Sequence, residues 1–410
     1  MFNRGKYFLF QTVLILLSPI TSFLVSLRYY KSSVSQFFFI IFAMYLGYYM
    51  GFVYDLMRHY MEIPMYYTGR DLNTIFGDFR VYLIGKEPFH ILFKYVFSRF
   101  TDSRQMFGAI SSGMYAMSFV FFLRQFKEFY NRRLPAFSTV LLLCVATVIE
   151  FYWYQGLRFW LGVYVFMGFY LKYVNSGKWW WLLFTPLVLL IHYALVTLII
   201  AALLNILLHH VTVYSRIAFL AFAFVIRSLN IDFVPLLLKY LPFINDLGIS
   251  ISDEKIRTSV LEHMNEVRTG GNIFYQNRTA VLLICGILIL TFFRYCRLRF
   301  NDKHITLLYF ALTLFSIACI GYVDLTFYER FSKVCVLVLY CYIFIVSVQN
   351  VRQWSRYHIM LFLVALSIST FSVFVVLMQI RSYLFYNELI FGNIFIDWDG
   401  NALNMKYGWN

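Results

Sequence analysis

Residues 179–208 read WWWLLFTPLVLLIHYALVTLIIAALLNILL, 30 residues without an acidic side chain, a lysine or an arginine. A bilayer core of about 30 Å is crossed by roughly 20 helical residues. The run is therefore too long for one ordinary crossing and too short for two full ones. Pro186 lies inside it and His192 lies near its centre. We predict two short helices folded back on each other, with the bend at Ile191–Tyr193.

Further apolar stretches follow one another along the whole chain. Hydrophobic residues make up 61% of it and charged residues 13%, with a mean hydropathy of +0.68, whereas soluble proteins carry about 25% charged residues. The composition predicts an all-α integral membrane protein with about 11–12 transmembrane helices, including the split re-entrant hairpin. A closed β-barrel is excluded because its strands alternate apolar and polar residues. The other spans are expected near 7–27, 34–54, 105–123, 136–153, 157–174, 214–230, 279–296, 304–322, 328–348 and 357–380.

The chain carries a net charge of +15, which raises the question of a nucleic-acid partner. If the N-terminus is outside, most of the basic excess falls in segments between spans that face the cytosol, as the positive-inside rule requires. Arg4 and Lys6 are exceptions, because this arrangement places them on the opposite side. The charge thus reports membrane orientation, and we expect no nucleic-acid partner.

The chain is predicted to form a single polytopic domain over residues 1–410, with two long outer loops at about 55–104 and 231–278. Within the first loop, the amphipathic run Phe89–Phe97 fits a helix lying in the membrane interface. The six cysteines fall in or beside spans without a CxxC or Cys/His pattern, which predicts small core residues rather than disulfides or a zinc site. No Walker-type or HExxH motif occurs, and we expect no cofactor and no metal.

The segment Tyr54–Tyr60 concentrates charged residues where the second span leaves the membrane. On a helix, Asp55 and His59 share a face at i, i+4, and Arg58 joins Asp55 at i, i+3. A carboxylate, a cation and an imidazole would then meet at a water-accessible interface. The alternative is an ion pair between Asp55 and Arg58 that only ends the helix.

Three further positions carry polar groups at span ends. Arg158 follows Gly156 in an aromatic turn, where its planar donor fork suits a lipid phosphate, or where it snorkels to the interface. His192 is either a hydrogen-bonded core residue or a cavity residue exposed by the bend. Glu329 and Arg330 open a late span and, as neighbours on a helix, are expected to have different partners.

Three motifs together resemble the EpsG-like branch of the Wzy-type O-antigen and capsular polysaccharide polymerases: Asp55-x-x-Arg58-His59-Tyr60, Gly156-Leu157-Arg158-Phe159, and Ile191-His192-Tyr193 in a split apolar segment. The resemblance implies a GT-C-like glycosyltransferase in the bacterial inner (plasma) membrane, with its active site facing the outside. Such enzymes join oligosaccharide repeat units carried on undecaprenyl diphosphate, and a chain-length regulator protein is an implied partner.

By position, the resemblance brings Asp55, Arg58, Arg158 and His192 into the active cavity. We expect the two arginines to hold the diphosphate, whose departure arginines stabilise without a metal. His192 or Asp55 would then handle the proton of the acceptor hydroxyl. The predicted catalytic residues are Asp55, His192 and Arg158, and the predicted substrate-binding residues are Arg58, His59, Tyr193, Glu329 and Arg330.

Two other functions remain open from the sequence. One is a flippase or secondary transporter for lipid-linked oligosaccharides, since transporters use broken helices around a midplane site. The charged residues here gather at the outer ends of spans, which favours an interfacial enzyme. The other is an O-antigen ligase-type transferase, which performs the same chemistry on another acceptor.

Overall fold

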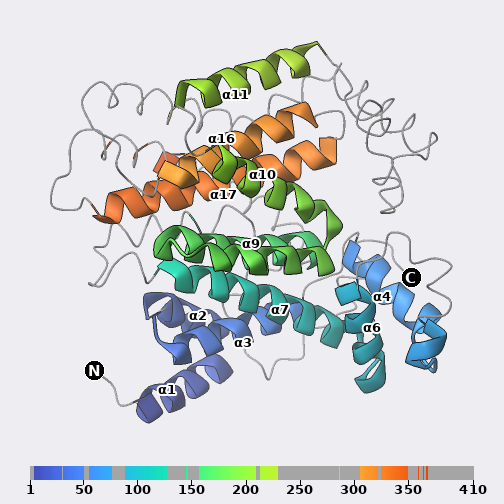
Figure 1. The fold of residues 1–410 in the computed structure, drawn as a ribbon. Coiled ribbons are helices and arrows are strands. Elements are labelled where there is room, and N and C mark those ends of the chain that lie inside the picture. Colours follow the sequence, from blue (N-terminus) through green and yellow to red (C-terminus); the bar gives the residue numbers. More distant parts are fainter. Residues whose placement is uncertain are drawn as a thin grey trace.

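The computed structural model describes residues 4–29, 31–49, 55–75, 88–126, 157–208, 213–229, 305–321 and 325–349, with single residues at 145, 286, 359, 363, 366 and 367 (Figure 1). Every element of regular structure in these segments is a helix, which confirms the all-α class. The helices are α1 (Arg4–Leu17), α2 (Pro19–Arg28), α3 (Ser33–Tyr49), α4 (Asp55–Tyr66), α6 (Pro88–Phe100), α7 (Arg104–Gln125), α9 (Leu157–Ser176), α10 (Val196–Leu207), α11 (Val213–Ser228), α16 (Ile305–Ile320) and α17 (Leu325–Gln349), with the 3₁₀ helices η3 (Trp179–Leu190) and η4 (Tyr193–Leu195).

Six of the predicted spans coincide with single helices. They are the stretches near 34–54, 105–123, 157–174, 214–230, 304–322 and 328–348, which correspond to α3, α7, α9, α11, α16 and α17. The stretches 136–153, 279–296 and 357–380 and the loop 231–278 lie outside the described residues, apart from single positions. The predicted first outer loop, at about 55–104, contains α4 and α6.

The helices α3, α7 and α9 form one layer of the bundle. The start of α3 meets the end of α7, where Arg124 Nε donates to Gln36 Oε1 at 2.7 Å. At the other end a Cβ on Gly47 would collide with Ser112, so α3 and α7 run antiparallel at close approach. By contrast α9 runs parallel to α7, because Tyr164 packs on Tyr115 in the middle of α7, and Phe169, further along α9, packs on Phe121, further along α7. A parallel pair needs a returning segment between its members, and the predicted span at 136–153 lies at that place in the chain.

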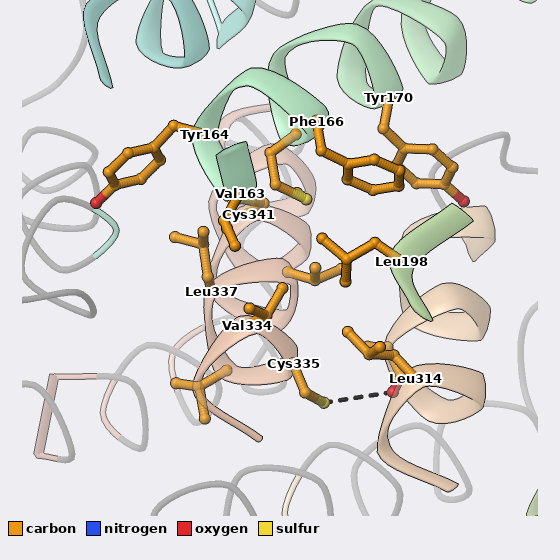
Figure 2. Packing of buried hydrophobic residues seen from close by; sticks show 14 of the residues in the cluster. Val163, Tyr164, Phe166, Tyr170, Leu198, Leu314, Val334, Cys335, Leu337 and Cys341 are labelled. Carbon is orange, nitrogen blue, oxygen red and sulfur yellow. Dashed lines mark hydrogen bonds between the residues drawn. The ribbon is translucent and has the colours of Figure 1, made fainter. Parts of the chain in front are cut away.

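A second layer, α16 and α17, packs on α9 and holds the main core (Figures 1 and 2). The two helices are antiparallel: Cys335 Sγ donates to the carbonyl oxygen of Ala311 at 3.3 Å, and Phe315 packs on Tyr328. Cys319, Cys335 and Cys341 are buried free thiols, as predicted for small core residues. Figure 2 shows side chains from α9, α10, α16 and α17 meeting in this core.

The run 179–208 forms a hairpin along α9. Its first arm, η3, starts beside the second half of α9, where Lys172 lies over the Trp181 ring at 5.5 Å. The bend reaches the first turn of α9, where the His192 and Phe159 ring centroids are 5.7 Å apart. The second arm returns, and Asn205 Nδ2 donates to Tyr170 Oη at 2.9 Å. The predicted break at Ile191–Tyr193 and the reversal of the chain are confirmed.

The 3₁₀ geometry of η3 explains how a short arm covers this distance. A 3₁₀ helix rises about 2.0 Å per residue, against about 1.5 Å in an α-helix. The 12 residues of η3 therefore span roughly 24 Å instead of about 18 Å. The bend consequently lies level with the first turn of α9 and not near the middle of the bundle.

The first apolar stretch departs from its prediction. We expected one crossing helix over 7–27, but Pro19 starts a second helix after a non-helical Ser18 (φ −152°, ψ 90°), because proline cannot donate to the preceding turn. Ser22 Oγ donates to Gln11 Oε1 at 2.8 Å, although the two are 11 residues apart. That separation would be about 16 Å along a continuous helix. The chain therefore folds back, and the prediction of a single helix is wrong.

The fold-back also changes where the chain starts. Arg4 Nη2 donates to Ser33 Oγ at 3.0 Å, and Tyr7 Oη lies 2.8 Å from Ser35 Oγ. Arg4 and Lys6 therefore lie at the end of the bundle that also holds Arg124, where the sequence had placed them opposite.

By length and composition, one helix in the described segments is able to cross a bilayer, α7 with its 22 residues. Four shorter apolar helices accompany it, over 33–49, 179–190, 193–207 and 305–320.

Candidate functional site

Several helices begin or end together at one end of the bundle, here called the site end. The helices α7, α9 and α17 all start there. Phe159, near the start of α9, packs edge-on against Phe331 of α17, with 5.4 Å between ring centroids. The far ends of α7 and α17 also meet, through Phe126 and Phe344. Because these three helices are parallel, residues from their first turns gather in one region.

Phe159 is the centre of one part of this region. Its ring is 2% exposed and lies edge-on to His192 from the hairpin bend. Arg330 of α17 places its guanidinium carbon 5.3 Å from the centroid of the same ring. The fold thus brings His192 and Arg330 together with the residue that follows Arg158, although the three come from distant parts of the chain.

A hydrogen bond within the bend indicates the tautomer of a neutral His192 ring. His192 caps η4, and its Nδ1 accepts a hydrogen bond from the backbone N–H of Ala194 at 3.4 Å. A neutral imidazole that accepts at Nδ1 carries its proton on Nε2. His192 is therefore set to donate from Nε2. Its neighbour Tyr193 is half-buried in the bend.

The predicted separation of Glu329 and Arg330 is confirmed. Glu329 Oε1 lies 3.7 Å from Lys333 Nζ, one turn further along α17, while Arg330 faces Phe159. Arg330 thus belongs to the region around Phe159, and Glu329 forms an ion pair along its own helix.

The helices α4 and α6 dock on the start of α7. Tyr60 Oη donates to the carbonyl oxygen of Asp102 at 2.8 Å, and Phe107 packs against rings from both helices. In α4, His59 is buried at 3% exposed while Arg58 is exposed, so the two point to different sides of the helix. Asp55 is the first residue of α4, and its side chain lies outside the described residues.

A buried polar network that the sequence did not predict joins α4 to α6. Lys94, 2% exposed, forms an ion pair with Glu62, and its Nζ lies 3.1 Å from His59 Nδ1. The rings of His59 and His90 meet edge-on with centroids 3.8 Å apart. The available signal was spacing: His90 and Lys94 lie at i, i+4 in an otherwise apolar helix.

The inward face of α6 combines the polar side chains His90 and Lys94 with the apolar Ile91 and Phe97. His90 and Lys94 face inward, whereas Leu92, Val96 and Phe100 are 52%, 43% and 82% exposed. An interface helix with its apolar side in lipid keeps its polar side toward the protein or water.

Electrostatics links this network to α9. Burial, followed by the charges of His59, Lys94, Arg158 and Arg58, holds the pKa of His90 well below its usual range. His90 is therefore neutral, and both predicted diphosphate ligands act on it. Its Nε2 is buried and has no hydrogen-bond partner among the described residues.

Within the described segments, no cluster of three or more histidine, cysteine, aspartate or glutamate side chains is arranged to hold a metal ion. Comparisons of this chain with protein-family models, with curated proteins and with solved structures give no match.

Proposed function

We propose that this protein is a polytopic membrane glycosyltransferase that polymerises oligosaccharide repeat units carried on undecaprenyl diphosphate. The motifs around Asp55, Arg158 and His192 resemble Wzy-type polymerases, and the proposed location is the bacterial inner membrane with the site end facing outward. Large apolar side chains on the outer faces of α6 and η3 support a lipid environment, among them Phe100 and Leu183, which are 82% and 63% exposed.

The observation that carries the proposal is the gathering of the predicted residues at the site end. His192 and Arg330 meet at the Phe159 ring. Arg58 belongs to α4, which docks on the start of α7, and Arg158 lies in the first turn of α9, which starts at the same end of the bundle. Converging cations of this kind stabilise the charge that develops on a departing diphosphate.

The proposed reaction follows from these positions. A hydroxyl of the incoming lipid-linked unit attacks the anomeric carbon of the growing chain, and the bond from that carbon to the diphosphate oxygen breaks with its electron pair leaving on the oxygen. Arg58 and Arg158 bind the diphosphate. His192, with its proton on Nε2, orients a sugar oxygen by donation, and Asp55 accepts the hydroxyl proton. Tyr193 and Arg330 line the sugar side, and His59 holds α4 in place through Lys94.

The direct test is to incubate the purified protein with a synthetic undecaprenyl-diphosphate repeat unit, without nucleotide sugar, with and without a metal chelator. We expect a ladder with the spacing of one repeat unit, resolved on a gel, in both reactions. An unchanged substrate with folded protein would contradict the proposal. Transfer of a single unit to an added lipid–core acceptor, without a ladder, would instead identify a ligase, and movement of the substrate across vesicles without new bonds would identify a flippase.

A further inference from the structure

The first two helices form a hairpin whose open end lies at one end of the bundle. The rings of Tyr7, near the start of α1, and Tyr29, which follows α2, meet edge-on with centroids 5.7 Å apart. Tyr7 Oη also lies 2.8 Å from Ser35 Oγ in the first turn of α3. Because α3 starts beside the end of α7 at Arg124, this open end is opposite the site end.

The closed end of the hairpin lies about halfway along α3. The chain turns at Ser18, and Phe23, one turn after Pro19, stacks on Phe42 with 4.6 Å between ring centroids. Phe42 lies near the middle of the 17-residue α3. The 14 residues of α1 span about 21 Å, whereas a bilayer core is about 30 Å thick. The hairpin therefore enters the bundle without passing along its full length.

The inner and outer sides of the hairpin are arranged as in helices surrounded by lipid. Gln11 and Ser22 are fully buried and hydrogen-bonded to each other, and Gln11 Nε2 donates to Tyr7 Oη at 2.9 Å. On the outer side, Leu9 and Leu17 are 66% and 65% exposed. Four further apolar side chains of α1 are also exposed: Phe8, Phe10, Val13 and Leu16. Soluble proteins mostly leave glutamine in water, whereas polar groups in hydrocarbon must find partners within the protein.

Basic residues gather at the open end. The first 54 residues contain no aspartate or glutamate, and their four bases are Arg4, Lys6, Arg28 and Lys31. All four are exposed. The phosphates of an anionic leaflet attract each such base by about 1 kcal/mol. A second copy of the hairpin fits less well, because two copies in one membrane have the same orientation and their bases would repel each other at the same depth.

We propose that α1 and α2 form a re-entrant hairpin that enters a single leaflet, with the outer side of α1 against acyl chains and the four bases at the anionic phosphates of that leaflet. The N-terminus and the start of α3 then lie on the same membrane surface, opposite the site end. In the proposed orientation this surface is the cytosolic one, and α3 is the first segment to cross. The inference rests on the membrane location in the proposed function, but not on the transfer reaction.

The test is the labelling of introduced cysteines in the full-length protein, in oriented membrane vesicles, with a maleimide that cannot pass the bilayer. Label on the protein's own cysteines is subtracted. Lys6→Cys and Lys31→Cys flank the hairpin, and we expect both to react from the same surface. Thr21→Cys, an exposed position at the closed end, should react from neither surface. Asp71→Cys, which follows α4 at the site end, is the control and should react only from the opposite surface.

Labelling of Lys6→Cys and Lys31→Cys from opposite surfaces would overturn the proposal, because a single crossing helix gives that pattern. Labelling of Thr21→Cys would also overturn it, since the closed end would then lie in water. Oxidation of Leu9→Cys in proteoliposomes of the purified protein should give no disulfide-linked dimer. A dimer would assign the apolar side of α1 to a second copy and overturn its assignment to lipid.

The role of the bases is measured by native mass spectrometry of lipids that the protein retains from vesicles of phosphatidylglycerol and phosphatidylcholine. Lys6→Gln/Arg28→Gln/Lys31→Gln should retain less phosphatidylglycerol than the wild type, and the charge-conserving control Lys6→Arg/Arg28→Lys/Lys31→Arg should equal it. Equal retention by the neutralised variant would overturn the assignment of the bases to lipid phosphates. A protein with this topology that makes no ladder would refute the proposed reaction and leave this inference intact.

Discussion

Two buried cations lie at opposite ends of the bundle, and their surroundings differ. Lys94, at the site end, is paired with Glu62 and lies against the imidazole of His59. Arg216, in the first turn of α11 and 3% exposed, has neutral hydrogen-bond acceptors throughout the described residues. Its Nη1 donates to Asn205 Oδ1 at 2.7 Å, and its Nη2 donates to the carbonyl oxygen of Leu208 at 2.6 Å.

The two buried cations differ in whether the groups that contact them are ionisable. The acceptors of Arg216 do not titrate, and the guanidinium ties α11 to α10 and, through Thr313, to α16. The partners of Lys94 are a carboxylate and an imidazole, both of which are ionisable side chains. Burial of a cation alone therefore says little about function, and the chemistry of its acceptors is the informative part.

The largest effect is expected when Arg158, at the start of α9, is compared with Lys172, near its end. Arg158→Gln should lower the rate of polymerisation by about 10²–10³, the usual cost of one donor to a developing anion. Lys172→Gln, at the other end of the same helix, should leave the rate unchanged, because Lys172 contacts the Trp181 ring far from the site. Initial rates in proteoliposomes at equal protein abundance measure both. Equal rates in the two variants would remove Arg158 from the site.

The next effect tests Arg216 as a structural contact. Arg216→Met leaves the Asn205 side chain and the Leu208 carbonyl without their donor, at a cost of about 1–3 kcal/mol for each buried unpaired group. We expect a lower unfolding temperature with near-normal turnover per folded molecule. Lys94→Met should show the reverse balance, with turnover falling more than stability. If Arg216→Met lowered turnover as much as Lys94→Met does, the two buried cations would not differ in their roles.

A smaller effect concerns the position of the bend without changing any charge. A Cβ on Gly162 would collide with Leu195, so Gly162→Ala should push the bend away from α9. Overpacking of this kind costs about 1–3 kcal/mol, and we expect a several-fold loss of activity from displacement of His192. Leu195→Val in the same protein should recover part of the loss. A Gly162→Ala variant with full activity would show that the bend need not be fixed.

The smallest effect is expected at Asp71, an exposed residue that follows α4. Its carboxylate accepts hydrogen bonds from the hydroxyl and the backbone N–H of Thr74, and these bonds lower the pKa of Asp71. The bonds therefore favour the folded state at neutral pH, and their contribution is lost as the pH falls through the lowered pKa. Thr74→Ala should reduce this acid dependence slightly in thermal melts taken across acidic pH, without affecting polymerisation.

The sequence was most informative where length and proline acted together. The run 179–208 is too long for one span, and Pro186 and His192 indicated the break that the structure contains. The same reasoning applied to Pro19 would have found the fold-back of α1, but the stretch 7–27 has the length of a single span and gave no reason to look for a break. The length of an apolar stretch does not indicate a break when that length already fits a single span.

The site was predicted in part for a similar reason. His192 and Arg330 stand out as polar residues in apolar surroundings, and the structure brings both to Phe159, the residue after Arg158. The run 89–97 was predicted as an amphipathic interface helix without a role for His90 or Lys94, because periodicity shows which residues share a face but not whether that face is turned inward or outward. Only the contacts of α6 with α4 and α7 decide that orientation.

The helical form of η3 has a mechanical consequence. If its 12 residues rewound into α-helix, the arm would shorten by about 6 Å, from the difference in rise per residue. The shortening would withdraw His192 from the edge of Phe159 toward the interior of the bundle. The position of the His192 imidazole along α9 therefore depends on the rise per residue of the helix that precedes it.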